Sequence, residues 1–203
     1  LTRPLSEGVC LDGGEMVYRN GVQEERYPSA LLRIRGMQNV ENAMAAIAAA
    51  RRIGVPPEAV RESLAAFPGL PHRVEFVRQF RGVSWFNDSK GTNVGAVATS
   101  LAHFDRSVIL IAGGRDKDSD FSLLNDLIAA RVKALVLIGE TRERLAQVWR
   151  GLAPAYLADD MAAAVARAWE LSRPGEVVLL SPACASFDMY RDYAQRGETF
   201  QNL

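Results

Sequence analysis

Residues 85–93 read Trp-Phe-Asn-Asp-Ser-Lys-Gly-Thr-Asn, and the rest of the chain is arranged to present this stretch. An apolar, β-rich run at residues 83–86 leads into it. Beyond it, apolar residues recur at the spacing of one helix face, at Val94, Val97, Ala98 and Leu101. The sequence therefore predicts a loop that joins the end of a strand to the start of a helix. Open α/β sheets bind their ligands at that edge.

Lys90 is the unusual member of this loop. The free N–H groups and the dipole at a helix start oppose a cation, so a lysine there indicates an anionic ligand nearby. The other loop residues are common in turns, and Thr92 or Asn93 could simply be the helix N-cap. On the loop alone, a binding site and an ordinary turn both stay open.

The composition is that of a globular protein with room for one domain and part of another: 203 residues, 48% hydrophobic and 24% charged. Lys+Arg and Asp+Glu are both 24, so no net charge attracts nucleic acid or an anionic membrane. The longest apolar runs are much shorter than the ~20 residues that span a bilayer. Because Cys10 and Cys184 suggest no disulfide framework and no secretory signal is visible, we expect a cytoplasmic protein. We also expect a monomer.

Two domains are predicted, at residues 1–71 and 72–203, because Pro68-Gly69-Leu70-Pro71 is the best linker in the chain. The chain starts at Leu1, and we interpret it as a fragment that lacks an amino-terminal part. The first domain should hold two β-runs joined by Asn20-Gly21. Helices should follow at residues 39–52 and from Pro56-Pro57 onward.

The second domain should be a doubly wound, mainly parallel, Rossmann-like α/β sheet, because strand and helix signals alternate and the strands are continuously apolar. Arg81-Gly82 should join an antiparallel edge hairpin. The last helix is expected from about Asp188. The predicted strands cover residues 74–80, 83–86, 107–112, 134–138, 155–157 and 177–180.

Two further loops follow strands. In residues 113–118, Gly113 and Gly114 would let the backbone approach a ligand, and Lys117 supplies a cation. In residues 181–188, small side chains before the last helix would leave backbone N–H groups free to cradle a carboxylate. For residues 113–118 the alternative is a solvated turn. For Cys184 the alternative is a buried core thiol. Together the loops predict a pocket rimmed by Lys90, Lys117 and Ser186 that suits an anionic, carboxylate-bearing molecule.

No phosphate loop, Gly-x-Gly-x-x-Gly motif or Cys-x-x-Cys motif occurs in the sequence. Four segments, in order along the chain, nevertheless resemble the Mur ligase family. They are residues 36–42 (GMQNVEN), 69–75 (GLPHRVE), 87–93 (NDSKGTN) and 180–197 (LSPACASFDMYRDYAQRG). The resemblance implies the end of a central ATPase domain followed by a carboxy-terminal domain. The Asp-Ser-Lys-x-Thr-Asn stretch resembles the member that adds D-glutamate to UDP-N-acetylmuramoyl-L-alanine.

That resemblance implies amide-bond formation in the cytoplasmic stage of peptidoglycan synthesis. ATP phosphorylates the alanyl carboxylate, and the amine of D-glutamate attacks the acyl phosphate. The family uses Mg²⁺, whose ligands would lie mostly in the missing amino-terminal part, so no metal ligand is expected here. Without a phosphate loop, this chain alone should be inactive.

Residue by residue, the resemblance places six side chains at ATP: Asn39, Asn42, His72, Arg73, Asp88 and Lys90. Asn39 and Asn42 would lie near adenine and Asp88 at the ribose, while Arg73 and Lys90 would act catalytically at the phosphates. D-Glutamate would be held by Thr92, Lys117, Ser186, Phe187 and Tyr193. The chain departs from the family at Gln38, where His is expected, at Gly91, where Ala is common, and at Tyr193, where Phe is expected.

Two other interpretations compete with this one. A folylpolyglutamate synthase or another Mur-type amide ligase would share the architecture but should lack the Asp-Ser-Lys-x-Thr-Asn stretch. A non-catalytic nucleotide- or effector-binding α/β module would share the fold without the reaction, because one architecture hosts many functions.

Overall fold

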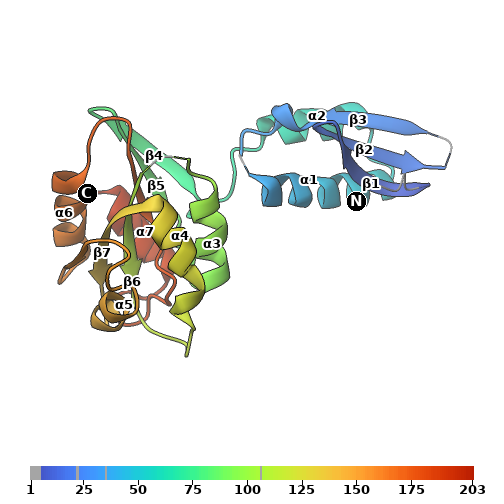
Figure 1. Ribbon diagram of the computed structural model, residues 1–203. Helices are drawn as coiled ribbons and strands as arrows, with labels where there is room; N and C mark the ends of the chain where they lie inside the picture. The colour runs from blue at the N-terminus through green and yellow to red at the C-terminus, as the bar shows by residue number, and fades with distance from the viewer. Residues whose placement is uncertain (1–5, 22, 35, 106) are drawn as a thin grey trace. The chain divides into compact units, whose positions relative to one another are not determined.

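The computed structural model describes residues 6–21, 23–34, 36–105 and 107–203 (Figure 1). Its contacts divide the chain into two units, Leu1–Gly69 and Leu70–Leu203, a division two residues before the boundary expected from the linker. No helix in the described part of the chain is both long and apolar enough to span a bilayer.

Unit 1 begins with a three-stranded antiparallel sheet. The expected pairing around Asn20-Gly21 is confirmed, with Arg19 opposite Glu24. The sheet also contains a strand that was not separately predicted, which the Gly13-Gly14 turn connects to its neighbour. Its elements are β1 (Glu7–Asp12), β2 (Glu15–Asn20), β3 (Glu24–Pro28), the 3₁₀ turn η1 (Ser29–Leu31), α1 (Met37–Arg52) and α2 (Pro57–Ala66).

The core of unit 1 lies between this sheet and the two helices. Met16, Tyr27 and Ile47 are fully buried in it, and Val60 of α2 joins them. Phe67 lies beyond the end of α2 and is 42% exposed. Pro57 starts α2 as predicted, since proline fits the first helical turn.

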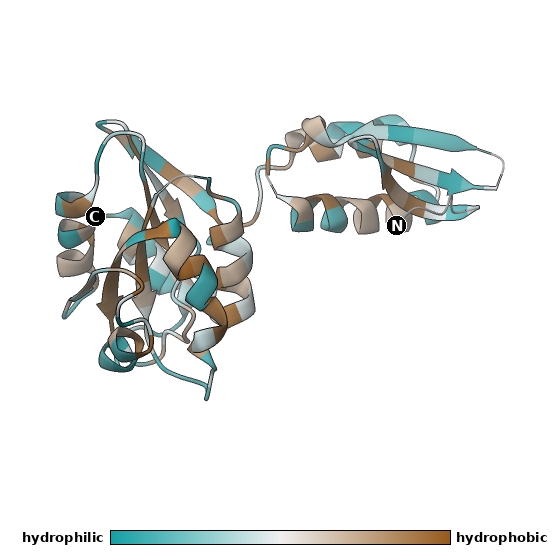
Figure 2. Ribbon diagram, in the orientation of Figure 1, coloured by the Kyte–Doolittle hydropathy of each residue, from teal (hydrophilic) through white to brown (hydrophobic). Residues whose placement is uncertain are grey.

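Unit 2 contains the predicted doubly wound sheet, with strand order β4-β5-β9-β6-β7-β8. Only the β4–β5 pairing is antiparallel, so the expected edge hairpin is confirmed. Figure 2 shows the central strands as the most hydrophobic part of this unit. The strands are β4 (Glu75–Phe80), β5 (Val83–Asn87), β6 (Val108–Gly113), β7 (Val132–Ile138), β8 (Ala155–Leu157) and β9 (Val177–Leu180).

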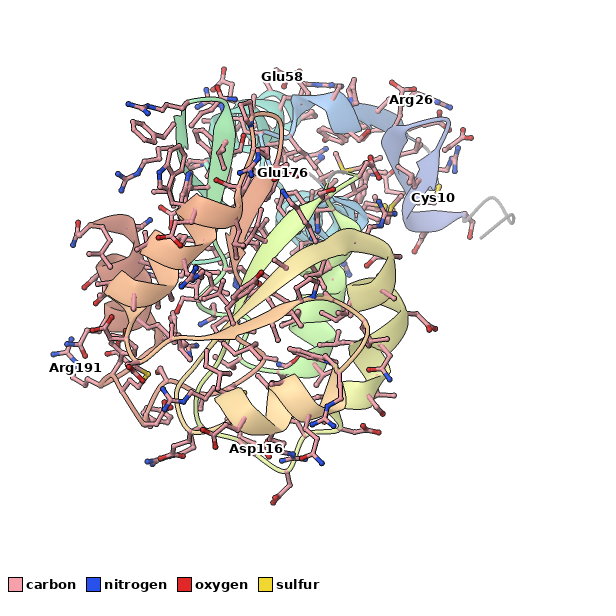
Figure 3. The ribbon with its side chains drawn as sticks, turned by 60° about the vertical axis from the view of Figure 1, so that its left-hand side comes forward. Cys10, Arg26, Glu58, Asp116, Glu176 and Arg191 are labelled. Carbon is pink, nitrogen blue, oxygen red and sulfur yellow. The ribbon has the colours of Figure 1, made fainter. Side chains whose placement is uncertain are left out.

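Helices cover both faces of the sheet, and alternate strand residues supply the two cores. Leu110 packs with the helices of one face, and its neighbour Ile109 packs with those of the other. Polar side chains, among them Asp116 and Arg191, point outward at the periphery (Figure 3). The first face carries α3 (Val94–Ala102), η2 (Phe121–Leu124), α4 (Asn125–Arg131) and α5 (Arg142–Val148), and the second carries α6 (Met161–Leu171) and α7 (Tyr193–Gln201).

The start of the last helix differs from the prediction. α7 begins at Tyr193 instead of near Asp188, because the Asp192 side chain accepts a hydrogen bond from the backbone N–H of Gln195 and caps the helix there. Asp188 lies in the preceding turns, where its carboxylate accepts from the backbone N–H of Glu140 at 2.9 Å. The small residues after β9 therefore do not sit at a helix start.

Candidate functional site

The three predicted loops lie together at the carboxyl edge of β5, β9 and β6, which are neighbours in the sheet. The backbone N–H of Ala183 donates to the Gly91 carbonyl at 2.9 Å. Arg115 and Ala185 exchange two backbone hydrogen bonds, of 2.9 and 3.0 Å. Segments almost a hundred residues apart in sequence thus form one continuous surface, as the topology predicted.

The glycines of the second loop serve the packing of these loops. A Cβ atom on Gly114 would overlap the Ala185 carbonyl oxygen, and one on Gly113 would overlap the Ile138 carbonyl oxygen. Both have positive φ, 140° and 117°, which glycine adopts without strain. We expected these glycines to let the backbone approach a ligand. In the structure, Gly114 allows close approach to the third loop and Gly113 allows close approach to the end of β7.

The backbone cradle predicted after β9 is also different. The N–H groups of Ser181, Ala183 and Ala185 donate to the carbonyls of Ile111, Gly91 and Arg115 in that order. These three donors are already used, so a carboxylate would have to be held by other N–H groups of the loop, and the cradle stays a prediction. Burial raises the pKa of the Cys184 thiol, which fits the alternative of a core thiol.

Asp88 ties the first loop to its surroundings. Its Oδ2 accepts from the hydroxyls of Ser100 and Ser181, each at 2.6 Å, and its Oδ1 accepts from the Val74 N–H at 3.3 Å. The residue is only 5% exposed, and burial raises the pKa of its carboxyl against the opposing effect of the two serine hydrogen bonds. The ribose contact stays a prediction, because this carboxylate is engaged inside the unit.

Gly91 accommodates that arrangement. A Cβ atom there would lie 2.5 Å from Asp88 Oδ2 and 2.8 Å from Ser181 Oγ. Ala is common at this position in the family that the sequence resembles. This chain has Gly at the point where the Asp88 carboxylate packs tightly against the loop.

Lys90 contacts the last helix. Its Nζ donates to the Tyr193 hydroxyl at 3.0 Å and lies 4.1 Å from the centroid of that ring, a cation–π geometry. No carboxylate of the described residues forms an ion pair with Lys90. Its positive charge is therefore held in place without being neutralised, as a site for an anion requires.

His72 is buried beside this contact and takes a positive φ of 63°. Asn87 Oδ1 accepts from the Ser89 N–H at 3.0 Å, so its amide nitrogen, 2.9 Å from His72 Nδ1, must be the donor. Nδ1 therefore accepts, and the ring proton is assigned to Nε2. Arg73, the next residue, is exposed.

The predicted glutamate ligands divide by exposure. Ser186 is 2% exposed, and none of the described residues bonds its hydroxyl. Lys117 is exposed, and its ammonium has no partner within the described ranges. Thr92 is half-buried, while Phe187 is 60% exposed. The Arg115–Ala185 bonds bring the segments carrying Lys117 and Ser186 to the same edge.

Asn39 and Asn42 belong to unit 1, one turn apart on α1, so they share a helix face. No group of three His, Cys, Asp or Glu residues in the described part of the chain could hold a metal ion. We therefore assign no residue of this chain to magnesium.

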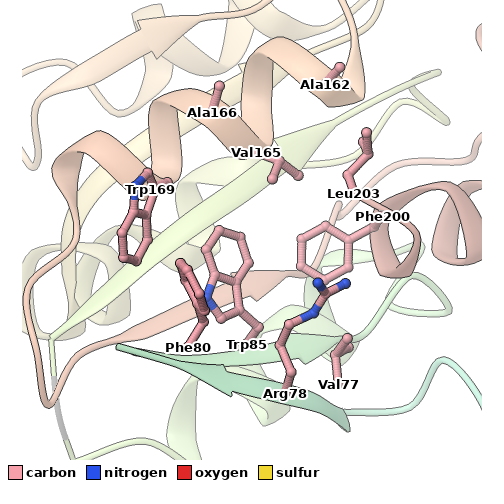
Figure 4. Close-up of a pocket in the computed structure, with 10 residues that line it drawn as sticks. All are labelled: Val77, Arg78, Phe80, Trp85, Ala162, Val165, Ala166, Trp169, Phe200 and Leu203. Atoms are coloured by element: carbon pink, nitrogen blue, oxygen red, sulfur yellow. The ribbon is translucent and has the colours of Figure 1, made fainter. Parts of the chain in front are cut away.

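Two hollows in unit 2 are not lined by the predicted rim of Lys90, Lys117 and Ser186. One of these, beside the loop after β7, is lined by residues such as Glu140 and Asp188. The other lies among aromatic side chains of β4, β5, α6 and α7 (Figure 4). The candidate site is thus a surface of three tied loops.

The family model described as "Mur ligase, glutamate ligase domain" matches residues 72–184, more than half of the chain. The chain belongs to the Mur ligase family. Among its curated relatives, the UDP-N-acetylmuramoylalanine--D-glutamate ligase of Geotalea uraniireducens (strain Rf4) is 46% identical over 98% of this chain. The protein of the same name from Anaeromyxobacter dehalogenans (strain 2CP-C) is 49% identical over 90% of it. The chain spans 44% and 40% of the length of these two relatives.

Solved structures share the Mur ligase fold at low identity. Mycobacterium tuberculosis folylpolyglutamate synthase complexed with ADP has a TM-score of 0.68 and 18% identity, covering 96% of this chain and 47% of that one. The UDP-N-acetylmuramate-alanine ligase MurC of Thermotoga maritima has a TM-score of 0.65 and 16% identity, covering 93% and 43%. These likenesses show the fold alone.

In this Mur ligase chain the sequence analysis missed Arg196, which is 1% exposed and joins two of the three loops. Its guanidinium donates to the Ser89 hydroxyl and carbonyl at 3.0 and 2.9 Å, and to the Cys184 and Ala185 carbonyls at 3.1 and 3.2 Å. Burial lowers its pKa to about 10. Arg196 lies three residues after Tyr193 and four before Phe200, so an arginine on an inward helix face was the available signal.

Proposed function

We propose that this chain forms the D-glutamate-binding part of an ATP-dependent ligase. The enzyme would join the amine of D-glutamate to the alanyl carboxylate of UDP-N-acetylmuramoyl-L-alanine in the cytoplasm, for peptidoglycan synthesis. The name shared by relatives at 44–49% identity supports this reaction. The surface of tied loops at the carboxyl edge of the sheet supports the location of the site.

One observation carries the glutamate assignment. The ammonium of Lys117 and the hydroxyl of Ser186 lack partners among the described residues, and the Arg115–Ala185 bonds bring their segments together. A cation and a hydroxyl without partners among the described residues suit a carboxylate, which accepts several hydrogen bonds. In this proposal Lys117 and Ser186 hold a carboxylate of D-glutamate, Thr92 donates from the first loop, and the Phe187 and Tyr193 rings flank the ligand.

Lys90 and Arg73 would act on the phosphate side. The Lys90 ammonium is oriented by Tyr193 and keeps its charge, so it can stabilise the negative charge that develops as the acyl phosphate forms and collapses. The nucleophile is the substrate's own neutral amine, so the protein chiefly positions the reactants. Asn39 and Asn42 would contact adenine, and the buried His72 and Asp88 would hold the backbone that presents Arg73 and Lys90.

A titration of the ¹⁵N-labelled chain with D-glutamate and then L-glutamate tests this proposal. We expect D-glutamate to shift the amides around Thr92, Lys117 and Ser186 selectively, with a dissociation constant near the millimolar range, about −4 kcal/mol. Lys117→Gln should weaken binding about tenfold, because a hydrogen bond to a charged group is lost.

Arg150→Gln is the matched control, because Arg150 is exposed and lies two residues beyond the end of α5, outside the three loops. It should leave the titration unchanged. Equal responses to both enantiomers, or equal weakening by both variants, would contradict the glutamate assignment. Shifts produced by a nucleotide but by neither enantiomer would favour the non-catalytic module.

A further inference from the structure

The loop at residues 113–118 carries Lys117, the cation that the proposed function assigns to a carboxylate of D-glutamate. Its neighbours in sequence are both acidic, since Asp116 precedes it and Asp118 follows it. An adjacent carboxylate competes with a ligand, because it attracts the same ammonium. The availability of Lys117 therefore depends on what these two carboxylates contact.

Asp116, at the periphery of unit 2 (Figure 3), is bonded to its own loop and to α5. Its Oδ1 accepts from the backbone N–H groups of Lys117 at 2.7 Å and of Ser119 at 3.0 Å. Its Oδ2 forms an ion pair with Arg144 of α5. Both carboxylate oxygens are thus in use, and within the described ranges neither bonds the Lys117 ammonium.

Arg144 is itself held at two further points. Its Nη2 donates to the Ser119 carbonyl at 3.1 Å, and its guanidinium lies 5.1 Å from the centroid of the Phe121 ring. Phe121 is 1% exposed and belongs to the core of unit 2. One planar guanidinium therefore bonds the loop at residues 116 and 119, on both sides of Lys117 in sequence.

The other acidic residues near this segment differ from Asp116. Glu140 pairs with Arg115 at 3.1 Å, and Asp120 accepts from the Ser122 N–H at 3.0 Å. Asp118 is exposed and forms no ion pair in the part of the chain that the structure describes. Water screens such an exposed charge. Asp116 is therefore the acidic neighbour whose charge is managed by a dedicated partner.

We propose that Arg144 and Asp116 are positioning residues of the glutamate site, an inference that rests on the proposed function. Arg144 neutralises the Asp116 carboxylate and keeps it bonded to the loop backbone, so the Lys117 ammonium remains available to the carboxylate of the ligand. Neither positioning residue touches the ligand. Without Arg144, the charge of Asp116 would compete for Lys117 and would repel an anionic ligand.

The D-glutamate titration of the ¹⁵N-labelled chain, at constant ionic strength, tests this proposal. Arg144→Gln should weaken D-glutamate about fourfold, the size of effect that an exposed ion pair supports. Arg144→Lys keeps the positive charge and should weaken it less than about twofold. The difference between Arg144→Gln and the unaltered chain should shrink in about 0.5 M NaCl, because salt screens exposed charges.

A double variant separates the effect of charge from that of structure. Asp116→Asn keeps an oxygen for the two backbone N–H groups and removes the negative charge. Arg144→Gln combined with Asp116→Asn should therefore bind D-glutamate within about twofold of the unaltered chain. A merely structural role for the ion pair predicts no recovery, because the double variant lacks that contact just as Arg144→Gln does.

Two controls accompany these variants. The Arg167 side chain on α6 is 49% exposed, against 50% for Arg144, and it too pairs with a carboxylate, that of Glu170. Its guanidinium also lies near a ring, 5.5 Å from the centroid of Tyr156. Arg167→Gln should therefore leave the titration unchanged. Asp118→Asn removes a charge from the same loop and should not restore binding to Arg144→Gln.

The results separate two kinds of failure. Suppose that the unaltered chain binds D-glutamate selectively, but Arg144→Gln binds it equally well or the double variant shows no recovery. The positioning role is then wrong and the glutamate site stands. Recovery through Asp118→Asn, or an equal loss in Arg167→Gln, would also overturn the role, because it would show a diffuse charge effect. If the unaltered chain does not distinguish the enantiomers, the proposed function fails and this inference fails with it.

Discussion

Each unit holds an arginine away from solvent, Arg51 partly buried in unit 1 and Arg196 fully buried in unit 2, and the two have opposite kinds of partner. In unit 1, Arg51 donates two hydrogen bonds of 2.7 Å to the Glu25 carboxylate. In unit 2, Arg196 donates only to carbonyls and a hydroxyl. The hydrogen bond to Glu25 raises the pKa of Arg51, whereas burial lowers the pKa of Arg196 to about 10. Unit 1 pairs its partly buried cation with a carboxylate, and unit 2 leaves its buried cation without one.

Two carboxylates show the same contrast, partly buried Glu25 in unit 1 and buried Asp88 in unit 2. Burial alone would raise the pKa of Glu25, but hydrogen bonds from Arg51 and Tyr27 outweigh it and lower that pKa. Burial raises the pKa of Asp88, whose nearest donors are two serine hydroxyls and a backbone N–H. Charges fully paired inside the protein serve stability, whereas unpaired charges beside an exposed edge are typical of binding sites. This contrast agrees with the proposed glutamate site in unit 2.

The largest expected effect comes from removing Arg196. Arg196→Met should destabilise unit 2 by about 3–5 kcal/mol, because the carbonyls of Ser89, Cys184 and Ala185 lose buried donors. All three tryptophans lie in unit 2, so urea unfolding followed by tryptophan fluorescence reports on this unit alone.

Arg51→Met should leave that fluorescence transition in place and should increase amide exchange only in the core of unit 1. Following each unit separately is necessary, since a chain of two units need not unfold in one step. A fluorescence midpoint unchanged by Arg196→Met would contradict the role assigned to this arginine.

A smaller effect is expected from Gly91→Ala. The added methyl group would press on Asp88 Oδ2 and Ser181 Oγ, so the carboxylate must leave one serine, at a cost of about 1–3 kcal/mol. The same fluorescence transition measures it, and Gly95→Ala is the control because its Cβ would meet no atom nearer than 3.5 Å. Combining Gly91→Ala with Asp88→Asn should cost less than the sum of the two single changes, since both act on one contact. Full additivity would show that the strain lies elsewhere.

The smallest effects are opposite pH trends. Folding raises the pKa of Asp88. Its contribution to the free energy of unfolding is therefore fully present below the unfolded pKa of about 3.9, and this contribution is lost as the pH rises through the folded pKa. Folding lowers the pKa of Glu25. Its contribution to the free energy of unfolding is therefore present above the unfolded pKa of about 4.3, and it is lost as the pH falls through the folded pKa. Between pH 3 and 7, the stability difference between the unaltered chain and Asp88→Asn should fall with rising pH.

The stability difference between the unaltered chain and Glu25→Gln should rise with rising pH over the same range. Fluorescence measures the first in unit 2, and amide exchange in β2 measures the second in unit 1. If Asp88→Asn and Glu25→Gln showed the same trend with pH, the contrast between these two carboxylates would be contradicted.

Local signals predicted most of the architecture. The apolar runs at β8 and β9 coincide with the observed strands, and strand–helix alternation predicted the parallel sheet. The start of α7 was placed too early because Met189 and Tyr190 extend its apolar pattern, although Asp192 is the residue that caps it. Gly113 and Gly114 were assigned to a ligand because a close approach between loops leaves no mark in a single sequence.

Site residues were harder to predict where their task depends on distant partners. The sequence identified Lys90, but the tyrosine that positions it lies 103 residues away. Arg196 was missed for the same reason, since its bonds to Ser89 span 107 residues. Local patterns indicate which residues are unusual, whereas long-range contacts decide what each does.

The bonds between α7 and the first loop also set an order of events during synthesis. Ser89 Oγ donates to the Tyr193 carbonyl, and Asn87 donates to the Gly197 carbonyl, across 104 and 110 residues. α7 leaves the ribosome after every other element of unit 2, and contacts this distant in sequence are slow to form. A nascent chain can thus pair its sheet before the Lys90 loop is held in place, so the candidate site is completed only when translation has passed residue 197.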